Sequence, residues 1–196
     1  MQVKKVEIRE LILRHALDEF EKNSYANATI RHIAERSKIS IGNIYRYFEN
    51  KDELFQAIIQ PVYSKLSALI FDLYRKDAME PIANISTIAS QVSKGIMEVY
   101  GQYGRELMIL VDKNTGSRYE NFMQTLIRMV NERLKQEMPL GDDPTQVLSY
   151  IVSSGFVEGL FTVLRKYENS KMAQDIIQRM ILFYFDDIQF RLDDKR

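Results

Sequence analysis

Polar and basic side chains are concentrated in residues 29–51 of this 196-residue chain. Their hydroxyl, amide, guanidinium and ammonium groups can hydrogen-bond to phosphate oxygens and to base edges, which is the chemistry of binding and not of bond cleavage. The segment contains five cations and two anions, a balance of +3, whereas the whole chain has a formal charge of zero. This local charge favours a phosphate-bearing partner, although a solvated surface could have the same composition. The candidate contact residues are Thr29, Arg31, Ser40, Ile41, Gly42, Asn43, Tyr45, Arg46, Tyr47 and Lys51.

Two short helices are predicted to present these side chains. Thr29 can cap a helix over residues 30–37, and Ser40 can cap a second one over 41–48. An amphipathic helix over 6–21 precedes them. Three helices packed in this way leave the start of the third facing outward, as in a helix-turn-helix whose second helix enters the major groove of DNA. The apolar residues expected to hold the helices together are Ile30, Ile33, Ala34, Ile39, Ile44 and Phe48.

Individual residues of the segment fit contacts with DNA. Gly42 lets the backbone approach closely, Asn43 can donate and accept at a base edge, and Ile41 can touch a thymine methyl group. Lys51 begins the next helix, where a cation is unfavourable to the helix dipole unless an anion is bound. Tyr45 could instead pack between the third helix and the first.

The run from Thr29 to Leu54, with IYRYF at 44–48 and NKDEL at 50–54, resembles the DNA-binding signature of the Tet repressor family of bacterial transcription regulators. The resemblance implies a DNA-binding domain over 1–50 and a ligand-sensing, dimerising domain over 51–196. Tyr47 stands where many members have histidine. The implied contacts are to phosphate from Thr29, Tyr45, Tyr47 and Lys51, and to bases from Ile41, Asn43 and Arg46.

Helical periodicity continues to the end of the chain, and no alternating strand pattern interrupts it. We expect an all-α protein of about nine helices. Pro61 should bend the fourth helix without ending it, Gly101 and Gly104 should interrupt the fifth, and Ser117 with Glu120 forms a capping box for the seventh. Pro81 suits the first turn of the fifth. The expected later helices span 51–74, 82–100, 106–112, 118–137, 144–166 and 172–191.

Aromatic and methionine side chains in the second half of the chain could line an apolar ligand cavity, or they could simply form the core. The family resemblance implies that a cavity exists. We therefore expect a small apolar or aromatic effector that releases the protein, most simply a repressor, from a near-palindromic operator. The candidate lining residues are Met97, Tyr100, Met108, Tyr119, Phe122 and Phe156.

The last two expected helices have more apolar surface than one packing face requires. Gly155 and Gly159, four residues apart, would let helices approach closely, and we expect both at a dimer interface. The resemblance implies a homodimer joined by a four-helix bundle. Glu158, Arg165 and Lys166 argue against a membrane span in this region.

Other classes of function are disfavoured by composition. The chain has no cysteine, which excludes thiolate metal sites and a cysteine nucleophile. His15 and His32 are lone histidines without a second ligand at metal spacing, so we expect neither a metal nor another cofactor. Arg31 and Arg36 could be solvated charges. A helical enzyme and a DNA-independent adaptor remain as alternatives, and the charged start of the chain, unlike a signal peptide, indicates a cytoplasmic protein.

Overall fold

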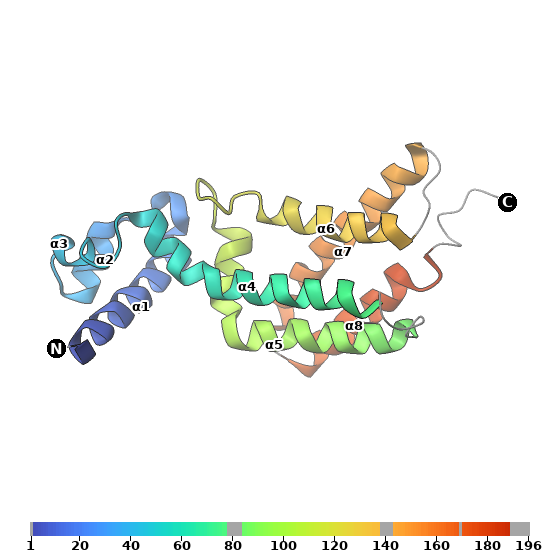
Figure 1. The fold of residues 1–196 in the computed structure, drawn as a ribbon, viewed down its shortest axis with the longest axis horizontal. Helices are drawn as coiled ribbons and strands as arrows, with labels where there is room; N and C mark the ends of the chain where they lie inside the picture. The colour runs from blue at the N-terminus through green and yellow to red at the C-terminus, as the bar shows by residue number, and fades with distance from the viewer. Residues whose placement is uncertain (1, 78–83, 138–142, 169, 189–196) are drawn as a thin grey trace. The chain divides into compact units, whose positions relative to one another are not determined.

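The computed structural model describes residues 2–77, 84–137, 143–168 and 170–188. These ranges contain eight α-helices and no strand, so the prediction of an all-α protein is confirmed (Figure 1). The helices are α1 (Gln2–Asn27), α2 (Ile30–Ser37), α3 (Ile41–Ile44), α4 (Lys51–Asp77), α5 (Ile85–Asp112), α6 (Phe122–Glu137), α7 (Asp143–Tyr167) and α8 (Lys171–Phe185).

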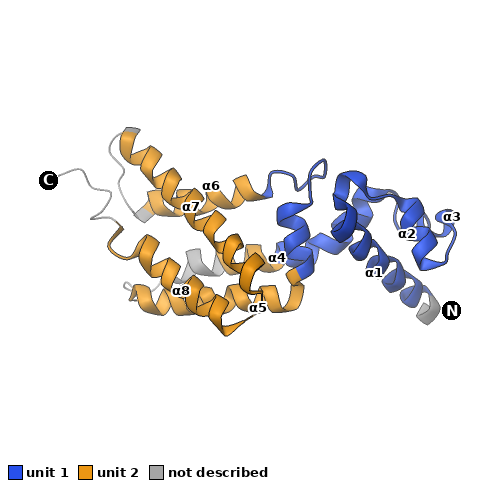
Figure 2. Cartoon of the chain, turned by 180° about the vertical axis from the view of Figure 1, so that it is seen from behind, with its two compact units in different colours: residues 1–64, 105–122 blue, residues 65–104, 123–196 orange. Residues whose placement is uncertain are grey.

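The chain divides into two compact units (Figure 2). Unit 1 comprises residues 1–64 and 105–122, and unit 2 comprises 65–104 and 123–196. The chain therefore passes between the units inside α4, inside α5 and at the start of α6. Helices α4 and α5 thus have a long part in each unit, and α6 has only its first residue, Phe122, in unit 1.

The first three helices enclose one apolar core within unit 1. Ile12, Ala16 and Phe20 of α1 are fully buried, as are Ile33 of α2 and Ile44 of α3. The helix spacing seen in the sequence thus directs these side chains to one interior, and the predicted packing of three helices is confirmed.

Both predicted caps of the helix-turn-helix are present. The Thr29 hydroxyl oxygen accepts a hydrogen bond from the backbone N–H of His32 at 3.2 Å. The Ser40 hydroxyl oxygen accepts one from the N–H of Asn43, also at 3.2 Å. Helix α3 is shorter than predicted, because the backbone after Ile44 continues as turns.

Helix α5 accounts for the difference between nine expected helices and eight. The predicted helices over 82–100 and 106–112 are joined in the single range of α5, which is broken at the non-helical Tyr103 (φ −136°, ψ 31°). Because Tyr103 lies between Gly101 and Gly104, the predicted interruption is present as a kink. The predicted start at Pro81 lies outside the described residues. Helix α4 passes through Pro61 and reaches Asp77, so the expectation that the proline does not end the helix is confirmed.

The predicted capping box at Ser117 is wrong, since α6 begins at Phe122. The Ser117 hydroxyl oxygen accepts from the N–H of Tyr119 at 3.1 Å, and the Glu120 carboxylate accepts from the N–H of Gly116 at 3.1 Å. These bonds stabilise a turn before α6. The side chains of Ser117 and Glu120 therefore hydrogen-bond within this turn and do not cap the helix.

Helix α7 is apolar on two opposite faces. One face is buried in unit 2 and includes Phe156, Val157 and Leu164. By length and composition α7 alone among the described helices could cross a membrane, with 39% of its most apolar window buried. Core helices of globular proteins pass the same test, so this property is weak support for a membrane span.

Helix α1 continues past its predicted end at Glu21 and contains a break at Ser24 (φ 63°, ψ 165°). This backbone region is almost exclusive to glycine and costs another residue about 1–3 kcal/mol. The break turns the chain toward α2, and the N–H of Ala28 donates to the Ser24 carbonyl oxygen at 3.0 Å.

We predict that Ser24→Gly raises the free energy of unfolding by about 1 kcal/mol, because glycine adopts this conformation without steric strain. Urea denaturation measures the change. Lys22→Gly, at an ordinary helical position of α1, is the matched control and should lower the free energy of unfolding by about 1 kcal/mol. Loss of stability in Ser24→Gly would contradict the strained backbone.

Candidate DNA-binding surface

The start of α3 presents a continuous group of accessible side chains, here called the α3 surface. Two large side chains at this place, Ile41 and Tyr45, are 43% and 50% exposed. The exposure of Tyr45 argues against its packing between α3 and α1. The α3 surface consists of Ser40, Ile41, Gly42, Asn43, Tyr45 and Arg46, of which only Asn43 is partly shielded.

Gly42 lies in open space within this surface. A Cβ atom added to it would meet no atom of the chain within 4 Å. The fold itself therefore does not require glycine here. Its small size matters only for an external surface that approaches the backbone closely, as a base edge does.

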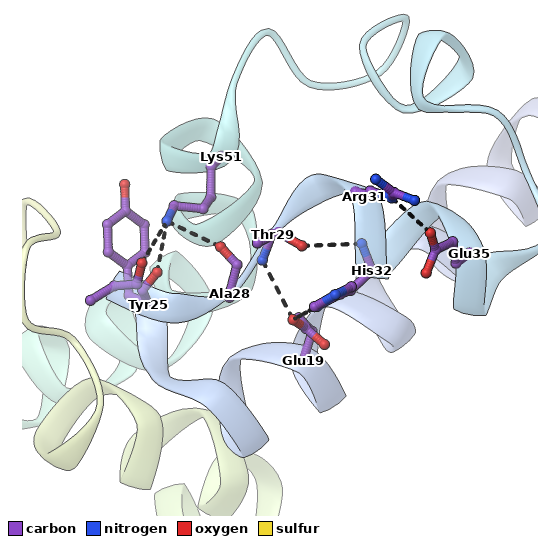
Figure 3. Close-up of polar contacts among 9 residues, drawn as sticks. Glu19, Tyr25, Ala28, Thr29, Arg31, His32, Glu35 and Lys51 are labelled. Carbon is purple, nitrogen blue, oxygen red and sulfur yellow. Dashed lines mark hydrogen bonds and ion pairs between the residues drawn. The ribbon is translucent and has the colours of Figure 1, made fainter.

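A buried carboxylate joins the start of α2 to α1. Glu19 is 2% exposed, and its Oε1 atom accepts from the N–H of Thr29 at 3.4 Å and lies 3.1 Å from Nδ1 of His32 (Figure 3). His32 is thus part of the helix-turn-helix support, and Thr29 stays exposed at the surface. Sequence reasoning missed Glu19, which its spacing does not distinguish from the charged residues around it.

The ammonium group of Lys51 already has partners within the chain. Its Nζ atom donates to the carbonyl oxygens of Tyr25 at 2.8 Å and Ala28 at 3.2 Å, with that of Ala26 at 3.4 Å (Figure 3). It also lies 4.5 Å from the centre of the Tyr25 ring. The cation therefore stabilises the carbonyl end of α1, where a positive charge is favourable.

Asn50 caps α4 beside Lys51. Its side-chain oxygen accepts from the N–H of Glu53 at 2.8 Å, and the Glu53 carboxylate accepts from the N–H of Glu49. These bonds satisfy part of the first turn, whose remaining amides are the usual place for an anion at a helix start.

Two arginines far along the chain bind the helix-turn-helix region inside unit 1. Arg105 forms ion pairs with Glu21 and, at 2.6 Å, with Asp18, and its hydrogen bond holds the pKa of Asp18 below the ordinary value. Arg118 donates to Asp52 at 3.3 Å and to Gln56 at 2.7 Å. Segment 105–118 therefore holds both α1 and α4.

Tyr25 connects these contacts. Its hydroxyl donates to Asp52 at 3.2 Å, and burial followed by the nearby Asp52 charge raises the pKa of Tyr25. Its ring contacts Phe20 and Phe55. None of these long-range pairs has a signal in the local sequence.

Arg31 and Arg36 at the side of α2 both have acidic partners. Arg31 pairs with Glu35 at 3.0 Å, and Arg36 lies 3.7 Å from Asp18. Both arginines are exposed, so these pairs contribute little stability and can exchange for a phosphate.

The candidate ligand-lining residues are distributed over both units. Met97 and Phe156 are buried in unit 2, where the Tyr100 hydroxyl donates to the Leu164 carbonyl oxygen at 3.3 Å. Met108, Tyr119 and Phe122 belong to unit 1. There the rings of Tyr119 and Phe122 both pack against Tyr63, and the Tyr119 hydroxyl donates to Gln60 at 3.2 Å.

Gly155 and Gly159 face α8 of the same chain. A Cβ atom at Gly159 would lie 2.7 Å from Cε of Met180, and one at Gly155 would lie 3.2 Å from the Tyr184 hydroxyl. The two glycines thus permit close packing of α7 on α8, which is an intrachain role. Within the described residues, no three acidic or histidine side chains are grouped so as to hold a metal ion.

Comparison with known proteins yields related regulators. An HTH-type transcriptional repressor of Mycobacterium tuberculosis is 35% identical over 74 residues, which cover 38% of this chain and 39% of the relative. The chain thus matches about two fifths of the length of that relative. The HTH-type transcriptional regulator UidR of Escherichia coli is 22% identical over 182 residues, 89% of each chain.

Solved structures show the same fold. A TetR-family regulator from Bordetella parapertussis has a TM-score of 0.68 at 18% identity and covers 91% of this chain and 94% of its own. One from Streptomyces coelicolor has a TM-score of 0.58 at 16% identity, over 95% and 86%. Residues 12–58 match the family described as "Bacterial regulatory proteins, tetR family". The chain thus contains an N-terminal segment similar to the tetR family of bacterial regulatory proteins, in a fold that it shares over most of its length with these solved structures.

Proposed function

We propose that the protein is a ligand-responsive transcription regulator whose homodimer binds a near-palindromic DNA operator. The observation that carries the proposal is the α3 surface, where an exposed isoleucine and tyrosine flank a glycine with open space around it. Residues 1–50 bind DNA, and 51–196 sense the ligand and dimerise. The relatives are named as transcriptional regulators, which favours this function, and a cytoplasmic location with it, over a helical enzyme.

Base edges are read from the α3 surface, by Ile41, Asn43 and Arg46. Phosphates on either side are bound by residues at helix starts and on aromatic arms. The proposed phosphate contacts are Thr29, Tyr45, Tyr47 and Lys51, with Arg31 and Ser40 flanking them.

Sequencing the genomic DNA fragments that the purified protein retains tests this function. We expect one near-palindromic sequence to be enriched, because a two-fold dimer presents two identical recognition helices to matching half-sites. Retention of no DNA would instead support the adaptor. Expression of the neighbouring genes in a deletion strain separates repression, which we propose, from activation.

Ligand binding can be transmitted along helices shared by the two units. Helix α4 starts beside the α3 surface and continues into unit 2. Helix α5 runs from unit 2 into the segment that holds α1 through Arg105 and α4 through Arg118. A shift of either helix would move these supports. We therefore propose that an apolar or aromatic effector lowers operator affinity and relieves repression.

The dimer contact is proposed on the outward apolar face of α7 and on α8. The large apolar side chains on this face are 46–71% exposed in the single chain. An apolar face of this kind is unstable in water unless another protein surface packs against it. A second copy is the cover that the two-fold operator requires. The exposed residues are Val147, Leu148, Tyr150 and Ile151 of α7, with Met172 and Phe183 of α8.

We predict that Asn43→Ala relaxes the preference at one operator position by about 1–3 kcal/mol, because a base-edge contact is lost. Lys51→Ala should weaken binding to all DNA about equally and should also lower stability, because three carbonyl oxygens lose their donor. Fluorescence anisotropy with operator variants measures both effects. Unchanged preference in Asn43→Ala, together with altered preference in Lys51→Ala, would reverse the assigned roles.

We predict that Ile151→Glu converts the dimer to a monomer in light scattering, since each copy would bury a charge in the contact. Gln91→Glu, an exposed position of α5, adds the same charge and should leave the dimer intact. Far-ultraviolet circular dichroism checks that both variants stay folded. A monomeric mass for the unmodified protein would refute the dimer.

We predict that an effector found by screening binds more weakly in the presence of operator, by the same factor, roughly 5 to 150, by which it weakens operator binding. Calorimetric titration with and without operator measures this factor. Met97→Ala and Met108→Ala then test which unit holds the effector. Equal effector affinity in both titrations would show that the ligand does not control DNA binding.

A further inference from the structure

Arg9 of α1 is held in place by an aromatic ring next to the proposed DNA contacts. Its guanidinium carbon lies 5.3 Å from the centre of the Phe48 ring, within cation–π distance. Arg9 is exposed, whereas Phe48 is only 2% exposed. The buried ring is fixed in the core, so it fixes the position of the cation above it.

The guanidinium has no carboxylate partner among the described residues, unlike most arginines of unit 1. Arg31, Arg36, Arg105 and Arg118 all form ion pairs. The helix positions three and four residues from Arg9 are Lys5, Val6, Ile12 and Leu13, which offer no acidic group. The positive charge at this place is therefore not neutralised by neighbours on its own helix.

The location of Phe48 indicates what the charge faces. Phe48 directly follows Tyr47 and precedes Lys51 by three residues, and both are proposed phosphate contacts. A guanidinium that lies over a ring keeps the N–H groups along its edge available for two oxygens of one phosphate. Because the ring has already restricted the side chain, binding costs less conformational entropy than for a free arginine.

We propose that Arg9 is a DNA-binding residue of α1, which contacts a backbone phosphate beside the half-site read by α3 and is positioned for it by Phe48. This inference rests on the proposed DNA-binding function. It adds to the helix-turn-helix a contact from outside residues 29–51, and the contact carries no base preference because phosphates are the same in every sequence.

Arg9→Met tests the proposal, because methionine keeps apolar contact with the ring and removes the charge. We expect about tenfold weaker binding to both the operator and an unrelated duplex, and a salt slope lower by about 1. Arg14→Met, another exposed cation of α1 with no ion pair among the described residues, is the matched control and should retain both values. Affinity and salt slope equal to those of the unmodified protein in Arg9→Met would overturn the proposal.

A second pair of variants separates DNA contact from mere packing. Phe48→Leu should weaken DNA binding by releasing Arg9. In the Phe48→Leu protein, the further change Arg9→Met should then reduce the affinity for DNA by a smaller factor than it does in the unmodified protein. Fully additive effects would overturn the positioning role of Phe48. Thermal unfolding of each variant shows whether a loss of affinity comes from unfolding. The variant Arg9→Lys, which keeps the charge, serves the same purpose. If the unmodified protein binds no DNA, the proposed function itself fails, a result distinct from failure of Arg9 alone.

Discussion

The helix-turn-helix depends on the apolar stripe of α1. Helices α2 and α3 have eight and four residues, and helices of this length are not stable in water by themselves. They form because Ile33 and Ile44 are buried against the core that contains Ile12 and Phe20 of α1. Burial of such side chains contributes about 1.5–3 kcal/mol each, which exceeds what the two caps provide. The exposed α3 surface is therefore held in place by buried residues on its opposite side.

Several cations of unit 1 support its fold, and one of them, Lys51, is also a proposed phosphate contact. Arg105, Arg118 and Lys51 are bound to carboxylates or carbonyl oxygens that hold α1 and α4. The neutral total charge of the chain is thus compatible with a positively charged binding surface. The ion pairs of Arg105 and Arg118 come from segment 105–122, which connects to unit 2 at both ends. A change in unit 2 can for that reason reach the supports of the helix-turn-helix through the chain itself.

Helix α7 illustrates how one composition can suggest three environments. Its apolar residues would suit a membrane, a protein core or a contact between two chains. Burial of one face within unit 2, with Ser149 and Ser153 hydrogen-bonded inside it, identifies a core helix. The opposite face remains exposed. The charges at the end of the helix, Arg165 and Lys166, are consistent with a contact between two chains in water.

The sequence by itself determined the helical class, the two caps at Thr29 and Ser40 and the outward position of the α3 surface. These features depend on contacts three or four residues apart, which the spacing of side chains specifies. Only the tertiary structure decided that Lys51 binds the end of α1, that Gly155 and Gly159 pack within the chain, and that Arg105 and Arg118 hold the helix-turn-helix. These contacts join residues 21 to 87 positions apart, and no local pattern specifies such pairs because they arise when whole helices pack.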